Sequence, residues 1–234
     1  MAKSTPLVLM TRPQAQSERF LAQLGQDVDA VISPILKIEP TGAELSPQHY
    51  KGVVLTSANA LQGTFANFSG LACFAVGDAT AEEAERCGLM VKSADGTADD
   101  LVEMIIAEKP EGRLLFLRGE HSRGELAARL RSAGIDVEEV ITYRQRPQPL
   151  SSQAVQALQR ADIAILPVFS PRSARLLAEA LAKVPSGAQL KVIAMSDAVA
   201  GSWGESVPAE VFVASEPKAT AMVRAVERVL KGLA

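Results

Sequence analysis

The chain has 234 residues, a length that accommodates one large domain or two small ones. Its 47% hydrophobic and 22% charged residues exclude a disordered chain, and its apolar runs are far shorter than the roughly 18 residues of a membrane span. A net charge of −3 without a Lys/Arg-rich run argues against a nucleic-acid binder. With only two cysteines and no recognisable signal peptide, we expect a cytoplasmic protein without a disulfide framework.

Short runs that are hydrophobic on both faces predict buried parallel strands. In chain order they lie at residues 7–10, 28–32, 53–55, 73–76, 113–117, 137–143, 163–166, 191–195 and 211–214, with a weaker candidate at 90–92. Helical patterns alternate with them at residues 14–24, 58–68, 79–87, 98–107, 122–133, 152–160, 171–181 and 219–230. This alternation predicts an α/β fold built from βαβ units and parallel sheets.

A weak internal repeat predicts two similar flavodoxin-like domains. Residues 7–12, 53–55, 75–79 and 101–102 resemble, in the same order, residues 114–118, 163–165, 194–198 and 222–223. The alternative is chance similarity between α/β segments. Two proline-bearing stretches, 34–40 and 144–149, predict extended connectors, because residues before proline avoid the helical region. The first domain would then combine 1–33 with 150–234, the second would span 41–143, and a two-stranded connector would leave a cleft between them.

The sequence lacks the usual nucleotide, dinucleotide and zinc motifs. His49 and His121 lie in polar segments typical of solvated loops, and Cys73 and Cys87 fit core packing better than a nucleophile role. We therefore expect neither a metal site nor a covalent catalytic set.

Several strand-to-helix turns are rich in small polar residues, and in a parallel sheet such turns meet at one edge. Their free N–H groups favour carboxylate or phosphate. Each turn could instead hold only a helix cap, but together they predict an anion-binding site. Arginines in or after these turns add forked donors: Arg12, Arg118, Arg123 and Arg172. The turn at Ser196 belongs to the same set.

Six segments, taken in order, resemble the uroporphyrinogen-III synthase family over nearly the whole chain. They are residues 10–13, 55–60, 75–81, 117–119 with Arg123, 134–143 and 169–171. The resemblance implies two α/β domains with the active site in their cleft. It also implies a cofactor-free reaction, in which hydroxymethylbilane is cyclised to uroporphyrinogen III with loss of water and inversion of ring D through a spiro intermediate.

The same resemblance assigns roles to individual residues. Tyr143 matches a cleft tyrosine and is the candidate to assist departure of the hydroxyl; packing between the domains is the alternative role for this residue. Five residues match turns expected to hold substrate carboxylates: Thr56, Ser57, Asn59, Thr80 and Ser170. The chain departs from the family where a Gly-x-x-Thr turn is common, since Ser196 and Val199 stand there.

The resemblance further implies a monomer that takes a tetrapyrrole substrate and makes a transient contact with the preceding deaminase, without nucleic-acid or membrane partners. Two other functions remain open from the residues alone. A two-domain anion-binding or sensory module would share the hinge and cleft. A sugar-phosphate enzyme on a flavodoxin-like sheet would need an acid/base pair that the sequence does not display.

Overall fold

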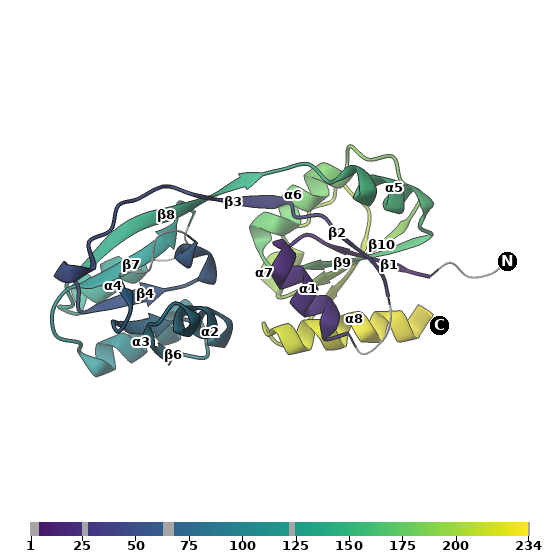
Figure 1. The fold of residues 1–234 in the computed structure, drawn as a ribbon. Helices are drawn as coiled ribbons and strands as arrows, with labels where there is room; N and C mark the ends of the chain where they lie inside the picture. Colours follow the sequence, from purple (N-terminus) through teal and green to yellow (C-terminus); the bar gives the residue numbers. More distant parts are fainter. Residues whose placement is uncertain (1–4, 25–27, 63–67, 122–124, 234) are drawn as a thin grey trace. The chain divides into compact units, whose positions relative to one another are not determined.

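The computed structural model describes residues 5–24, 28–62, 68–121 and 125–233. The chain forms two compact units, each with its own sheet (Figure 1). Unit 1 combines the chain up to Lys37 with the chain from Pro147 onward, and unit 2 spans Ile38–Arg146. The predicted α/β class with parallel sheets is confirmed.

The sheet of unit 1 is entirely parallel, in the order β2-β1-β9-β10-β11. Taken in chain order this is 2-1-3-4-5, the flavodoxin-like arrangement. Its strands are β1 (Leu7–Met10), β2 (Asp29–Ile32), β9 (Ile163–Val168), β10 (Gln189–Ala194) and β11 (Glu210–Val213).

Helices cover both faces of this sheet because its strands are apolar on both sides. Val8 and Met10 pack on the face of α1 (Gln14–Ala22) and α8 (Ala219–Leu233). Leu7 and Leu9 pack on the opposite face. That face is covered by α5 (Ser152–Arg160), α6 (Pro171–Leu181) and the short α7 (Asp197–Ala200).

The sheet of unit 2 has the order β3-β8-β7-β4-β5-β6. The strands are β3 (Leu36–Pro40), β4 (Gly52–Leu55), β5 (Ala72–Ala75), β6 (Met90–Ser93), β7 (Leu114–Gly119) and β8 (Val137–Pro147). Strands β4 to β8 pair in parallel. One face carries the 3-10 turn η2 (Ala58–Leu61) and α2 (Asp78–Arg86), and the other carries α3 (Ala98–Glu108) and α4 (Leu126–Ser132). A second 3-10 turn, η1 (Pro47–His49), precedes β4.

Strand β3 runs antiparallel to β8 at the edge of unit 2. The N–H of Thr41 donates to the carbonyl of Thr142 at 2.9 Å, and the N–H of Gln148 donates to the carbonyl of Ile35 at 3.0 Å. Partners whose numbers rise on one strand while they fall on the other identify an antiparallel pair. The stretches predicted as extended connectors are therefore largely paired strand, and β8 continues through residues 144–147.

The internal repeat maps onto equivalent strands of the two sheets. Strands β7, β8, β4, β5 and β6 occupy in unit 2 the order that β1, β2, β9, β10 and β11 occupy in unit 1. The resembling segments fall on the pairs β1/β7, β4/β9 and β5/β10. The two units share one spatial arrangement, although the chain visits the strands of unit 2 in a different sequence.

Most predicted helices form where expected. Ser170 accepts a hydrogen bond from the N–H of Ser173 at 3.1 Å and caps α6, with Pro171 at the first helical position. The predicted helix at 58–68 is wrong at its start, because Ala58–Leu61 is a 3-10 turn and Gln62 after it is extended. Residues 63–67 of that prediction, and 122–124 of the helix predicted at 122–133, lie outside the described residues.

Leu166 lies fully buried on β9, in the same core cluster as Trp203, the single tryptophan. We predict that Leu166→Ala lowers the free energy of unfolding by about 2–5 kcal/mol, since it removes buried apolar contacts and leaves a cavity. Urea denaturation followed by Trp203 fluorescence measures this change. Val211→Ala is the control, because Val211 is 40% exposed on the edge strand β11 and should change stability by about 0.5 kcal/mol or less. Equal effects of the two substitutions would contradict this assignment of the core.

Candidate functional site

Six of the predicted site residues lie at the carboxyl ends of parallel strands in unit 2. Strand β4 leads into Thr56, Ser57 and Asn59, β5 leads into the turn before Thr80, β7 ends at Arg118 and Gly119, and β8 carries Tyr143. The N–H of Val76 donates to the carbonyl of Leu55, and the N–H of Glu120 donates to the carbonyl of Tyr143, both at 3.0 Å. These bonds hold the turns together at one edge of the sheet, where ligands bind in such folds.

Tyr143 is a buried tyrosine, 6% exposed, packed in the core between the sheet and η2. Burial raises the pKa of its phenol above the ordinary value of 10.0, while a side-chain hydrogen bond with Ser57 opposes the rise. A hydrogen bond that lowers the pKa of an acid favours its charged form, so the bond with Ser57 stabilises the phenolate relative to the phenol. At neutral pH the phenol therefore keeps its own proton.

Ser57 links the backbone of η2 to this phenol. Its Oγ accepts a hydrogen bond from the N–H of Asn59 at 3.2 Å, which makes it the N-cap of the 3-10 turn. Ser57 therefore connects the Asn59 N–H and the Tyr143 phenol in one hydrogen-bonded chain.

Arg118 already forms hydrogen bonds with other groups of unit 2. Its Nε donates to Oε2 of Glu139 at 2.8 Å, and its Nη1 donates to the carbonyl of Gly119 at 3.1 Å. Arg131 contacts the other oxygen of Glu139 at 3.3 Å. Glu139, which sequence reasoning missed, therefore shares its charge between two arginines, and an anion at this edge would compete with it for Arg118.

The remaining four predicted residues lie in unit 1, again after parallel strands. Arg12 follows β1, Ser170 and Arg172 follow β9, and Ser196 follows β10. Ser196 is the N-cap residue of α7 without a side-chain cap hydrogen bond. Val199, where the family often has threonine, is buried in the apolar core, whereas Thr80 in unit 2 is a buried polar side chain. Arg123, also predicted, lies outside the described residues.

Arg12 is a largely buried cation that lies on an aromatic ring. Its guanidinium carbon lies 4.2 Å from the centroid of Phe169, which in turn meets Phe20 edge-on at 5.4 Å. Its Nε donates to Oε1 of Gln16 at 3.0 Å. Burial, with a smaller contribution from Arg19, lowers the pKa of Arg12 to about 10. Among the described residues, no carboxylate lies within ion-pair distance of this guanidinium, so the charge is positioned without a neutralising partner.

Two contacts of these sites give no recognisable signal in the sequence. The stacking of Arg12 on Phe169 joins residues far apart in the chain, and only the neighbouring β1 and β9 reveal it. Gly119 lies in one of the segments that resemble the family. Its close approach to the ring of Tyr143, however, depends on the register of β7 and β8.

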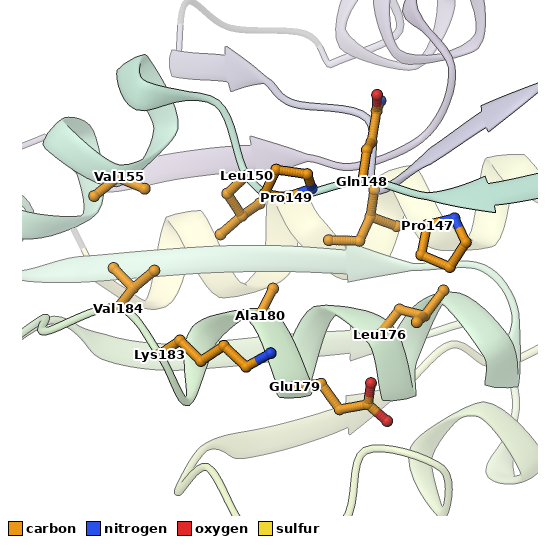
Figure 2. A pocket seen from close by; sticks show the side chains of 11 residues that line it. Pro147, Gln148, Pro149, Leu150, Val155, Leu176, Glu179, Ala180, Lys183 and Val184 are labelled. Atoms are coloured by element: carbon orange, nitrogen blue, oxygen red, sulfur yellow. The ribbon is translucent and has the colours of Figure 1, made fainter.

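A pocket of about 370 Å³ in unit 1 lies apart from all the predicted residues. Figure 2 shows its walls, formed by the segment Pro147, Gln148, Pro149 and Leu150 on one side and the second half of α6 on the other. Among the described residues that line it, Lys183, just after α6, is the only cation, and Glu179 of α6 adds a carboxylate. A ligand with many carboxylates does not match these walls.

His49 and His121 are exposed. Cys73 is buried on β5, and burial raises the pKa of its thiol to about 12. Within the described ranges, no cluster of three or more His, Cys, Asp or Glu side chains could hold a metal ion. None of the helices in this part of the chain has both the length and the apolar character needed to cross a membrane.

The fold and the residues at the strand ends define a class of α/β protein made of two parallel-sheet units, each with polar turns at its carboxyl edge. A family model described as uroporphyrinogen-III synthase HemD matches residues 17–224. The chain belongs to the uroporphyrinogen-III synthase family, as the sequence resemblance predicted.

Two solved structures share this fold. Uroporphyrinogen-III synthetase from Helicobacter pylori aligns with 17% identity and a TM-score of 0.69, covering 97% of this chain and 100% of that chain. A mutant uroporphyrinogen III synthase from the extremely thermophilic bacterium Thermus thermophilus aligns with 18% identity and a TM-score of 0.51, covering 97% and 99%. A search of curated protein sequences finds no match.

The hydrogen bond with Ser57 gives a direct prediction for the titration of Tyr143. The chain has two tyrosines, so a Tyr50→Phe variant reports Tyr143 alone by tyrosinate absorbance. In that background we expect a midpoint above 10.0, and Ser57→Ala should raise it further, because the substitution removes the hydrogen bond that lowers the pKa of the phenol. A midpoint that falls or stays unchanged in Ser57→Ala would show that Ser57 does not lower the pKa of Tyr143.

Proposed function

We propose that this chain cyclises hydroxymethylbilane to uroporphyrinogen III, with loss of water and inversion of ring D. The observation that carries the proposal is the family match over residues 17–224, in a chain that belongs to a family of cyclising lyases. The polar turns at the carboxyl edge of each sheet suit a substrate with eight carboxylates.

In this reaction the main task of the protein is to position the substrate. Departure of the terminal hydroxyl as water leaves an azafulvene at ring A, and ring D attacks it through its substituted carbon. The resulting spiro intermediate fragments and recloses with ring D inverted. The pyrroles supply the electrons, so the enzyme must hold the substrate folded and exclude the uninverted closure. The one further task is to assist departure of the hydroxyl by hydrogen bonding or proton donation.

Tyr143 is the residue we assign to that task. Its pKa lies above the ordinary value of 10.0, so the phenol is protonated at neutral pH and can donate. The hydrogen bond with Ser57 holds the phenol at this position. Burial in a low-dielectric core strengthens such a bond relative to water.

Substrate carboxylates are assigned to the turns of both units. We propose as binding residues Arg12, Thr56, Ser57, Asn59, Thr80, Arg118, Ser170, Arg172 and Ser196. Backbone N–H groups of the turns contribute alongside these side chains.

Arg12 has the strongest physical support among these residues. Stacking on Phe169 and the bond to Gln16 fix the guanidinium before any ligand arrives, so little side-chain entropy is lost on binding. A carboxylate that reached it would form a charge-assisted, forked hydrogen bond. The lowered pKa of about 10 indicates a charge that burial disfavours, and an anion would relieve that cost.

Four expectations from the sequence stay predictions: a cytoplasmic location, a monomer, a reaction without a cofactor, and a transient contact with the preceding deaminase. So do the boundaries of domains at 1–33 with 150–234 and at 41–143.

The assay for the proposed activity generates hydroxymethylbilane in situ and separates the oxidised products as type I and type III isomers. Spontaneous closure gives type I, so protein-dependent type III establishes both cyclisation and inversion. We predict that Tyr143→Phe slows type III formation roughly tenfold, the equivalent of one lost hydrogen bond of about 1–1.5 kcal/mol. Unchanged turnover would remove the role of Tyr143, whereas type I alone from the unsubstituted folded protein would refute the function.

Arg12→Gln tests carboxylate binding in the same assay. We predict a rise of roughly 10- to 100-fold in KM, because a charge-assisted hydrogen bond of about 1.5–3 kcal/mol is lost. Arg175→Gln is the matched control, since Arg175 is an exposed arginine of α6 whose partner is Glu179 on the same helix. The assignment fails if both variants keep the parent KM.

A further inference from the structure

The place of Tyr143 depends on an irregularity between β7 and β8. Arg118 pairs with Ile141, but the next residue, Gly119, pairs with Tyr143, so Thr142 is an extra residue in β8. Ile141 is 38% exposed, while Thr142 and Tyr143 are both buried, which breaks the alternation of a regular strand. A bulge of this kind redirects a side chain at the end of a strand.

Thr142 anchors the bulge to the neighbouring turn. Its hydroxyl donates to the carbonyl of Ala60 at 3.1 Å, in the interior of unit 2. That bond ties β8 to η2, the same turn whose N-cap, Ser57, bonds the phenol. The backbone before Tyr143 and the hydroxyl group that contacts its oxygen are therefore held by one element.

Gly119 leaves the space that the phenol ring occupies. A Cβ at this position would lie 2.6 Å from Cζ, 2.8 Å from Cε2 and 2.9 Å from Oη of Tyr143. All three of its nearest neighbours belong to that side chain, and each distance is too short for a real contact. Gly119 is not among the glycines with positive φ, so its backbone conformation suits any residue. Glycine is needed at position 119 because it lacks a side chain, and not because the backbone there has an unusual conformation.

We propose that Gly119 is a positioning residue for the reaction: the absence of a side chain at 119 fixes the phenol of Tyr143 at the carboxyl edge of the unit 2 sheet. This inference rests on the proposed function, because Tyr143 is the residue assigned there to the leaving hydroxyl. Tyr143 belongs to a packed core cluster, so a Cβ at 119 can be accommodated only if the ring moves from its place there.

The test uses Gly119→Ala in the Tyr50→Phe background, where Tyr143 is the sole tyrosine. A displaced ring gains water, so the titration midpoint of Tyr143 should fall toward 10.0, and type III formation should slow tenfold or more in kcat with little change in KM. Gly187→Ala is the matched control, since a Cβ there meets nothing within 4 Å and its φ is not positive. It should leave both readouts unchanged.

An unchanged Tyr143 midpoint in Gly119→Ala would overturn the inference whether or not the protein makes type III product. A shifted midpoint with unchanged kcat would overturn it as well. Failure of the proposed function is a separate result, type I product alone from the parent protein.

If Gly119→Ala does not fold, a double substitution at positions 119 and 143 still tests the inference. Tyr143→Leu removes all three clashing atoms, so Gly119→Ala should be tolerated in that background, as judged by circular dichroism and thermal unfolding. Folding rescued by Tyr143→Leu supports the inference. Misfolding of Gly119→Ala in both backgrounds contradicts it.

Discussion

Parallel pairing is the constraint on which both units depend. It brings the carboxyl ends of successive strands to one edge of each sheet, where each turn presents backbone donors and short polar side chains. Helices on both faces bury most side chains of the central strands, and the polar turns at this edge remain at the surface. A substrate rich in carboxylates needs this kind of surface, and an acidic protein can supply it locally without a basic patch.

The two units place different groups at the ends of this shared arrangement. Unit 1 places a half-buried arginine on an aromatic face next to the cap of α6. Unit 2 places a buried phenol in a core, hydrogen-bonded to a serine. The repeat therefore preserves the order of the strands but not the chemistry at their ends.

The sequence predicted what depends on local pattern. Strands apolar on both faces and the polar turns could be inferred from neighbouring residues. Strand β3 was predicted only as an extended connector beside prolines, because its pairing with β8 joins residues far apart in the chain. The contacts that shape the sites join distant residues, and no local pattern encodes a bulge anchored by Thr142.

If ligand carboxylates bind at the carboxyl edges of the two sheets, amide hydrogen exchange with and without the cyclised product detects this binding. Exchange should then slow in the turns at residues 11–14, 56–59, 77–81 and 169–173 of the full chain. The pocket-lining segment at 176–184 should exchange at the same rate in both states. Protection confined to that segment, with the turns unaffected, would place the ligand away from the sheet edges.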